Sequence, residues 1–160
     1  MAELADLPLS TRLFLKTYPW RRIDPVPWAE PRKSLAASNV ALVSTAGLVL
    51  PTQPRFDDDI KGGDWSYREI PDDADVSTLI ESHRSKSFDH SGLRTDANLG
   101  LPLDRLHELV RDGLIGSANR RHFSLMGSIT APGRLIAQSA PAVADALAAD
   151  EVDAVLLIPI

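Results

Sequence analysis

The sequence predicts an α/β fold: a single domain with a small, mainly parallel sheet, flanked by helices and preceded by a Pro/Trp-rich N-terminal arm. Two near-continuous apolar runs, Val40–Val43 and Val152–Ile160, are typical of parallel strands that helices cover on both faces. A helical pattern leads directly into the second run, which gives the helix-to-strand unit of such folds. We therefore assign 1–38 to an N-terminal helix and extended arm, and 39–160 to the α/β domain.

The composition excludes several classes of protein. The chain has 160 residues, 44% of them hydrophobic and 24% charged, which is ordinary for a soluble globular domain. The net charge of -5 argues against a nucleic-acid binder, because that class needs a basic surface. No apolar run is long enough to span a bilayer, and the acidic start 1–6 is unlike a secretion signal, so we expect a cytoplasmic protein that binds no membrane. The lack of cysteine excludes disulfides, thiol catalysis and zinc–thiolate sites for these residues.

The N-terminal segment combines a short helix with an arm. Leu9–Thr17 has apolar residues at helical spacing and is followed by Pro19. The closely spaced prolines from Pro19 to Pro31 cannot sustain a helix or a central strand, so we expect an extended arm. Trp20 and Trp28 either pack this arm onto the domain surface or make it a docking arm for another subunit.

A core strand is predicted over Asn39–Leu50, and small residues follow its apolar part. Ser44, Thr45 and Gly47 would let a ligand or another backbone approach closely, although a plain strand-to-loop turn is the alternative. The acidic run 57–59 lacks the spacing of a calcium loop and is interpreted as a solvated turn. Further strands are predicted over Trp65–Ile70 and Val76–Ser82.

The segment 82–92 is the richest polar constellation in the chain. It follows a predicted strand and contains His83, Asp89 and His90, side chains that bind metals or transfer protons. The spacing of the two histidines matches no helical metal pair. We therefore expect hydrogen-bonded loop histidines and no metal site.

The next helix begins at Pro102, carries one apolar stripe and stops at Gly113, where a left-handed residue is expected. Later, Pro141 is expected to break or kink a helical stretch, with Ser139 capping a second helix that runs to Ala149. The apolar stripe of the first helix consists of Leu103, Leu106, Leu109 and Val110.

A second polar cluster spans 120–127. Its arginines, Arg120 and Arg121, are suited to holding a carboxylate. His122 and Ser124 allow a Ser–His nucleophile with Asp89 as its orienting group, but the Gly-x-Ser-x-Gly elbow of such enzymes is missing. A surface turn is the structural alternative.

The final run, Val152–Ile160, is predicted to be a strand buried on both faces. It directs the chain towards the carboxyl edge of the sheet, where open α/β folds bind their ligands. Convergence of the polar side chains on this strand end would indicate an active site, and scatter would favour a binding or assembly module.

Several stretches together resemble one family, the glycine/betaine/sarcosine/D-proline reductase selenoprotein B family, and in particular its short stand-alone members. The resemblance covers the chain from about Pro19 onward and rests on the order and number of the matching stretches. These are 40–47, 82–83, 88–90, 98–106, 113–116, 122–127 and 152–159.

The resemblance implies an oxidoreductase component that cleaves a small-molecule substrate reductively. It places a selenocysteine or cysteine directly after the terminal Leu-Leu-x-Pro strand, just beyond Ile160. We therefore expect a chain terminated at a selenocysteine codon and inactive in this form, with no other cofactor. The resemblance also implies a partner reductase subunit bearing a pyruvoyl group and a thiol–disulfide electron donor, and an oligomer is compatible with it.

Residue type assigns the candidate roles. His83, Asp89, His90 and His122 are the candidate catalytic residues, which would move protons. The alternatives to the reductase are a non-catalytic binding or assembly module and a His/Asp/Ser-based hydrolase. The candidate substrate-binding residues are Ser44, Thr45, Asn98, Arg121 and Ser124.

Overall fold

The computed structural model describes residues 4–18, 22–85 and 89–160. The chain divides into two compact units, Met1–Glu30 and Pro31–Ile160. In the first unit a short turn, η1 (Leu4–Asp6), precedes α1 (Leu9–Thr17), which confirms the predicted helix. Trp20 lies outside the described residues, and Trp28 is exposed. Within the described ranges, every helix is too short or too polar to cross a bilayer.

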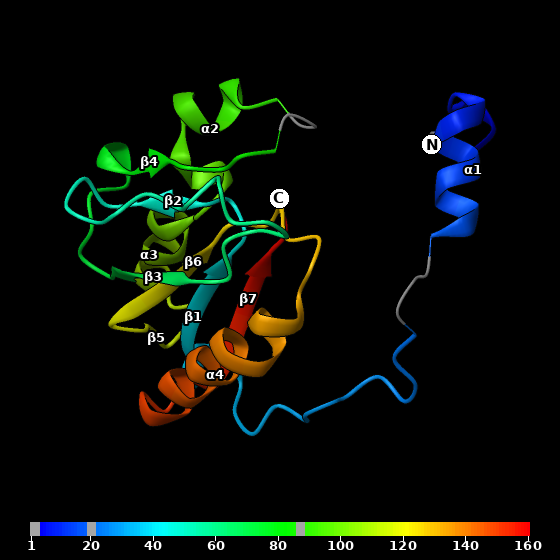
Figure 1. The fold of residues 1–160 in the computed structure, drawn as a ribbon. Helices are drawn as coiled ribbons and strands as arrows, with labels where there is room; N and C mark the ends of the chain where they lie inside the picture. Colours follow the sequence, from blue (N-terminus) through cyan, green and yellow to red (C-terminus); the bar gives the residue numbers. More distant parts are fainter. Residues whose placement is uncertain (1–3, 19–21, 86–88) are drawn as a thin grey trace. The chain divides into compact units, whose positions relative to one another are not determined.

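The second unit contains the mixed, mainly parallel sheet that the sequence predicts (Figure 1). Its central strand, β1 (Asn39–Ser44), pairs in parallel with β5 (Ser117–Ala118) and β6 (Arg121–Leu125) along one edge and with β7 (Ala154–Ile158) along the other. β3 (Tyr67–Pro71) adds an antiparallel strand to β6. β1 is buried because it has neighbours on both edges, and Ala41 and Leu42 are fully inaccessible.

Two predicted strands are shorter than the sequence suggests. The apolar run after β1 is interrupted by Gly47, whose φ of +67° turns the chain before β2 (Leu48–Val49). The predicted strand at Val76–Ser82 is instead a turn, η3 (Val76–Thr78), followed by β4 (Ile80–Glu81), which pairs antiparallel with β2. Each correction has its own local cause: the left-handed Gly47 ends the first strand, and the Asp75 side chain that caps η3 turns the second.

Helices cover both faces of the sheet. α3 (Leu103–Arg111) buries Leu103 and Leu106 on one face, and Gly113, with a φ of +71°, ends it as predicted. α4 (Ala140–Ala149) lies on the opposite face (Figure 1). Short elements complete the unit: η2 (Leu35–Ala37), α2 (Ser91–Thr95) and η4 (Ala97–Leu99).

The second helix predicted to end at Ala149 is confirmed as α4, with Ser139 at its N-cap position, but Ser139 makes no side-chain cap bond and the helical stretch is not broken before Pro141. A π-helical turn, η5 (Leu135–Ser139), runs directly into α4, and the N–H of Ala140 donates to the carbonyl of Leu135. Pro141 is tolerated because it falls in the first turn of α4, where an N–H is dispensable. Ser139 has helical backbone angles and donates its hydroxyl to the carbonyl of Trp65.

The prediction that β7 is buried on both faces is also wrong. The exposed fractions of Val155, Leu156 and Leu157 are 38%, 50% and 68%. β7 is a border strand that pairs only with β1 among the described residues (Figure 1). An apolar run predicts that a strand is covered, but the element that covers it need not belong to these residues.

Candidate functional site

The carboxyl ends of β1, β6 and β7 meet at one edge of the sheet, as we predicted from the final apolar run. The backbone N–H of Ile160 donates to Oγ1 of Thr45 at 2.8 Å, and the N–H of Thr45 donates to the carbonyl of Ile158 at 3.0 Å. On the other side, the N–H of Gly127 donates to the carbonyl of Thr45 at 2.8 Å. Thr45 therefore joins the end of β7 to the loop that follows β6.

Gly127 is required by the close approach of these segments. A Cβ atom at this position would lie 2.8 Å from the carbonyl oxygen of Ile160 and 3.0 Å from Cβ of Thr45. Real Cβ atoms do not make contacts that short with a backbone oxygen, so any side chain would displace the end of the chain. The sequence analysis did not single out Gly127, although its place directly after a predicted strand was a signal.

His83 lies beside the same strand end. The N–H of Ser82 donates to the carbonyl of Gly47 at 2.8 Å, and a Cβ at Gly47 would lie 3.2 Å from Cα of His83. Burial lowers the pKa of the half-buried His83, and the carboxylate of Glu81 opposes that shift. His83 is therefore neutral at pH 7, and its Nδ1 accepts from the backbone N–H of Ser85 at 3.1 Å, so the ring proton is on Nε2.

His90 is held in the same loop by acceptors on both sides. Its Nδ1 contacts the Oε1 atom of Glu81, and its Nε2 lies 2.6 Å from the carbonyl of Ser85. Both ring nitrogens of His90 therefore face oxygen acceptors. Arg94 also donates to Glu81, at 3.3 Å. The ring centroids of His83 and His90 are 6.5 Å apart.

Asp89 lies at the start of α2 and bonds to its backbone. Its Oδ1 accepts from the N–H of Ser91 at 2.9 Å, and this bond lowers the pKa of the exposed Asp89 carboxyl. It therefore stabilises the first turn of α2.

Ser44 and Ser124 lie opposite each other on β1 and β6, and both are fully buried. The Ser44 hydroxyl donates to the carbonyl of Gly100 at 2.5 Å and accepts from the N–H of Ala46 at 3.0 Å. The Ser124 hydroxyl has no hydrogen-bond partner among the described residues. Neither serine is placed beside a histidine side chain by these contacts.

His122 lies within the core, towards α3. Its Nδ1 accepts from the backbone N–H of Leu42 at 3.0 Å, so the proton is on Nε2, which donates to Oδ1 of Asp72 at 3.1 Å. The same Asp72 oxygen accepts from Nε2 of His107 at 2.8 Å. Burial lowers the pKa of His122, and Asp72 opposes the shift. The His122 side chain therefore supplies the acceptor for the backbone N–H of Leu42 in β1.

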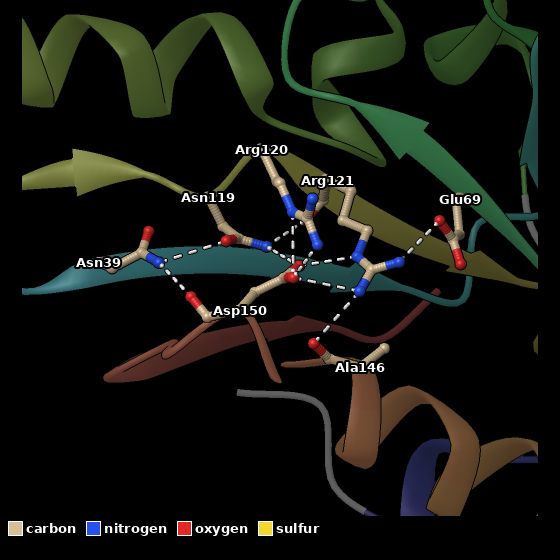
Figure 2. Close-up of polar contacts among 7 residues, drawn as sticks. All are labelled: Asn39, Glu69, Asn119, Arg120, Arg121, Ala146 and Asp150. Carbon is tan, nitrogen blue, oxygen red and sulfur yellow. Dashed lines mark hydrogen bonds and ion pairs between the residues drawn. The ribbon is translucent and has the colours of Figure 1, made fainter. Parts of the chain in front are cut away.

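Arg121 is held at the opposite, amino end of the parallel strands (Figure 2). Asp150, whose side chain is only 2% exposed, accepts from Nε of Arg121 at 2.7 Å and from Arg120. The two guanidinium groups hold the pKa of Asp150 well below its usual range. Glu69 accepts from Arg121 as well, at 3.2 Å. The hydrogen bonds of Arg121 to Asp150 therefore hold the end of α4 against the sheet.

Asn98 has a capping role. Its Nδ2 donates to Asp96 at 3.0 Å and to Asp104 at 2.9 Å, and its Oδ1 accepts from the N–H of Asp104 at 3.1 Å. These bonds close the first turn of α3.

The structure thus gathers Thr45, His83 and His90 around the carboxyl edge, with Ser44 and Ser124 buried at the ends of β1 and β6, and places Asn98, Arg121 and His122 elsewhere. Glu81 and Gly127 join that edge, although the sequence analysis did not include them. Among the described residues, no group of three or more His, Asp or Glu side chains is arranged to hold a metal. The arrangement can bind a chain end and place two imidazole rings beside it.

Comparison with known proteins gives one family. Residues 7–159 match the model of the glycine/sarcosine/betaine reductase selenoprotein B family. The chain is 32% identical over 136 residues to the D-proline reductase subunit gamma of Acetoanaerobium sticklandii. These aligned residues make up 84% of this chain and 54% of that protein. It is 29% identical over 155 residues to the glycine reductase complex component B subunit gamma of Symbiobacterium thermophilum, covering 97% of this chain and 36% of the relative.

A more distant relative is the betaine reductase complex component B subunit beta of Peptoclostridium acidaminophilum, at 25% identity over 122 residues, 76% of this chain and 28% of the relative. The chain therefore spans about half, or less, of the length of the curated relatives that it matches. No solved structure matches it.

Proposed function

This chain belongs to the glycine/sarcosine/betaine reductase selenoprotein B family, and on that premise we propose that it is a subunit of a reductase complex. Its relatives are named as subunits of D-proline, glycine and betaine reductases, which supports a small amine or amino acid as the substrate. A partner subunit would activate that substrate, and a thiol donor would supply the electrons. We assign the complex to the cytoplasm.

The observation that carries this proposal is the junction at Ile160. Thr45 and Gly127 fix the end of β7, and the backbone of His83 packs against Gly47, two residues after Thr45. The family resemblance expects a selenocysteine or cysteine directly after this strand. A selenolate or thiolate there would attack the activated substrate carbon and displace its amine, forming a C–Se or C–S bond. A donor thiolate would then attack the selenium or sulfur, releasing the carbon as the protonated product, and a second thiol would reduce the resulting selenenylsulfide or disulfide.

The residues of this chain would prepare that position. Thr45 would fix the direction in which the chain leaves β7, because its hydroxyl binds the N–H of Ile160. Gly127 leaves no side chain over the carbonyl of Ile160. His83, kept neutral by burial and with its Nδ1 bonded to the N–H of Ser85, would offer the N–H of Nε2 to the selenolate or thiolate.

Two experiments test the proposal. The codon after that of Ile160 in the source gene should encode selenocysteine or cysteine, followed by an open frame; an ordinary stop without continuation would contradict the assignment of the nucleophile. The product translated through that codon, combined with its partner subunit and dithiothreitol, should cleave D-proline, glycine, sarcosine or betaine reductively. Absence of turnover with all four would contradict the proposed substrate class.

A matched pair of variants tests the junction itself. Gly127→Ala should lower turnover, because its Cβ would displace Ile160, whereas Gly133→Ala adds a Cβ that meets no atom within 4 Å and should leave turnover unchanged. Equal turnover in both variants would show that the junction is not part of the site. A His/Asp/Ser hydrolase receives no support, because Asp89, His122 and Ser124 each lie among different neighbours.

A further inference from the structure

Two loops are locked together beside the end of β7. The N–H groups of Thr130 and Ala131 donate to the carbonyl of Gly62 at 2.9 and 3.0 Å. A Cβ atom at Gly62, whose φ is +88°, would lie 2.5 Å from Cβ of Ala131, so the two backbones are as close as they can be. The same loop after β6 begins at Gly127, which contacts the carbonyl of Ile160. The loop that bears Gly62 therefore belongs to the carboxyl edge of the sheet.

Arg84 reaches this loop from the segment that follows β4. Its Nη1 donates to the carbonyl of Ile60 at 3.0 Å and to that of Asp58 at 3.3 Å. The preceding residue, His83, packs against Gly47 just after the end of β1. Arg84 is therefore tied on both sides to segments that surround the carboxyl edge.

The guanidinium group of Arg84 has donors to spare. The two carbonyls use the hydrogens of Nη1, and within residues 4–18, 22–85 and 89–160 no acceptor bonds its Nε or Nη2 and no carboxylate pairs with it. The side chain is half-buried, so its position is fixed while one side stays accessible. Nε and Nη2 lie on one side of the guanidinium plane, the side that binds both oxygens of a carboxylate. By contrast, Arg94 pairs with Glu81.

We propose that Arg84 binds the carboxylate of the substrate, an inference that rests on the proposed reductase function. D-Proline, glycine, sarcosine and betaine all carry a carboxylate on the carbon whose bond to nitrogen would be cleaved. Holding that carboxylate therefore places the reacting carbon for the whole class. The sequence analysis gave this role to Arg121, which the structure holds at the opposite end of the strands.

The electrostatics of His83 agree with this assignment. Burial lowers the pKa of His83, and the positive charges of His90 and Arg84 lower it further. The guanidinium group is therefore close enough to His83 to act on its imidazole. A carboxylate on Arg84 would lie beside the ring that is assigned to the nucleophile.

Binding can be measured on the purified chain, because it requires neither the nucleophile nor a partner subunit. In nuclear magnetic resonance spectra of the isotope-labelled chain, the Nε–H signal of Arg84 is identified by its loss in Arg84→Gln. This signal should shift saturably with D-proline, glycine or betaine, and not with D-prolinamide or glycinamide, which lack the negative charge. The signal of Arg111, 73% exposed at the end of α3, is the control and should stay in place.

A single carboxylate pair gives millimolar affinity, so the titration should extend to about 100 mM ligand. No saturable shift of Arg84 with any of the three carboxylates, or an equal shift with the amides, would overturn the proposal.

Turnover by the full-length product separates this proposal from the proposed function. Arg84→Gln should raise KM for D-proline about 10- to 100-fold with little change in kcat, because a carboxylate contact is made equally in the ground and transition states. Arg111→Gln should change neither constant. An unchanged KM in Arg84→Gln would overturn the role of Arg84 even if the complex is an active reductase. Carboxylate binding at Arg84 without any turnover would instead contradict the reductase function and leave the binding site supported.

Discussion

Replacing His122 by leucine should destabilise the fold by an amount that the contacts of His122 allow us to estimate. Leucine fills a similar volume in this fully buried position but offers no acceptor to the N–H of Leu42, which is itself inaccessible. A buried donor left without a partner costs about 1–3 kcal/mol, and the lost bond to Asp72 adds to this, for a total of about 2–4 kcal/mol. For a chain of this size the melting temperature should fall by about 5–15 °C.

His107→Leu is the matched control. His107 binds the same oxygen of Asp72, but its side chain is 38% exposed and no buried donor depends on it. Its loss should therefore cost less than about 1 kcal/mol. Urea unfolding of both variants at pH 7 measures the difference. A free energy of unfolding for His122→Leu within about 1 kcal/mol of the wild type would refute the assignment of the Leu42 contact.

The pH dependence of stability provides an independent check. Burial lowers the pKa of His122 in the folded chain, so above the ordinary histidine value of about 6.5 both states carry it neutral. As the pH falls below that value the unfolded chain binds the proton first, and the free energy of unfolding decreases. His83, whose pKa is also lowered, contributes with the same sign. His122→Leu should therefore lose less stability than the wild type between pH 7 and pH 5, and an unchanged slope would contradict the burial effect.

Two other substitutions are informative. Gly47→Ala should lower the melting temperature more than Gly113→Ala. Both positions have a positive φ, but only at Gly47 would the new Cβ lie against His83, 3.2 Å away. Equal melting temperatures would contradict that contact. Asp150→Asn should lower the melting temperature at pH 7 but progressively less as the pH falls through the acidic range, because the lowered pKa of Asp150 gives stability only while the carboxylate is ionised. A drop that is the same at both ends of a thermal-unfolding pH series would contradict the ion pairs with Arg121.

Local sequence was sufficient for much of the fold. The helices at Leu9–Thr17 and Leu103–Arg111 follow from apolar spacing and from Pro and Gly punctuation, which depend on neighbours within a few residues. The buried parallel strand Asn39–Ser44 follows from its continuous apolar run. Predictions failed where a remote contact decided the outcome, as at Ser139, which was expected to cap a helix and instead bonds the carbonyl of Trp65.

The candidate site was predicted only in part for the same reason. The polar loop around His83 and the small residue Thr45 were recognised by composition, and both lie at the carboxyl edge. Arg121 and His122 have the same chemical types as catalytic residues, but Asp150 and Asp72, which hold them, lie 29 and 50 residues away in sequence. Residue type does not reveal such a partner, so a structural arginine or histidine looks the same in sequence as a catalytic one.

The sequence by itself determined the fold class, the parallel central strand and the family, since these are encoded in periodicity and in the order of short stretches. Only the tertiary structure decided that β7 stands at an open edge, that Thr45 binds Ile160 across 115 residues of chain, and which histidines share the carboxyl edge. The physical reason is that a strand pattern records how apolar its surroundings must be, whereas the partner that covers an edge or satisfies a buried polar group is chosen by packing between distant segments.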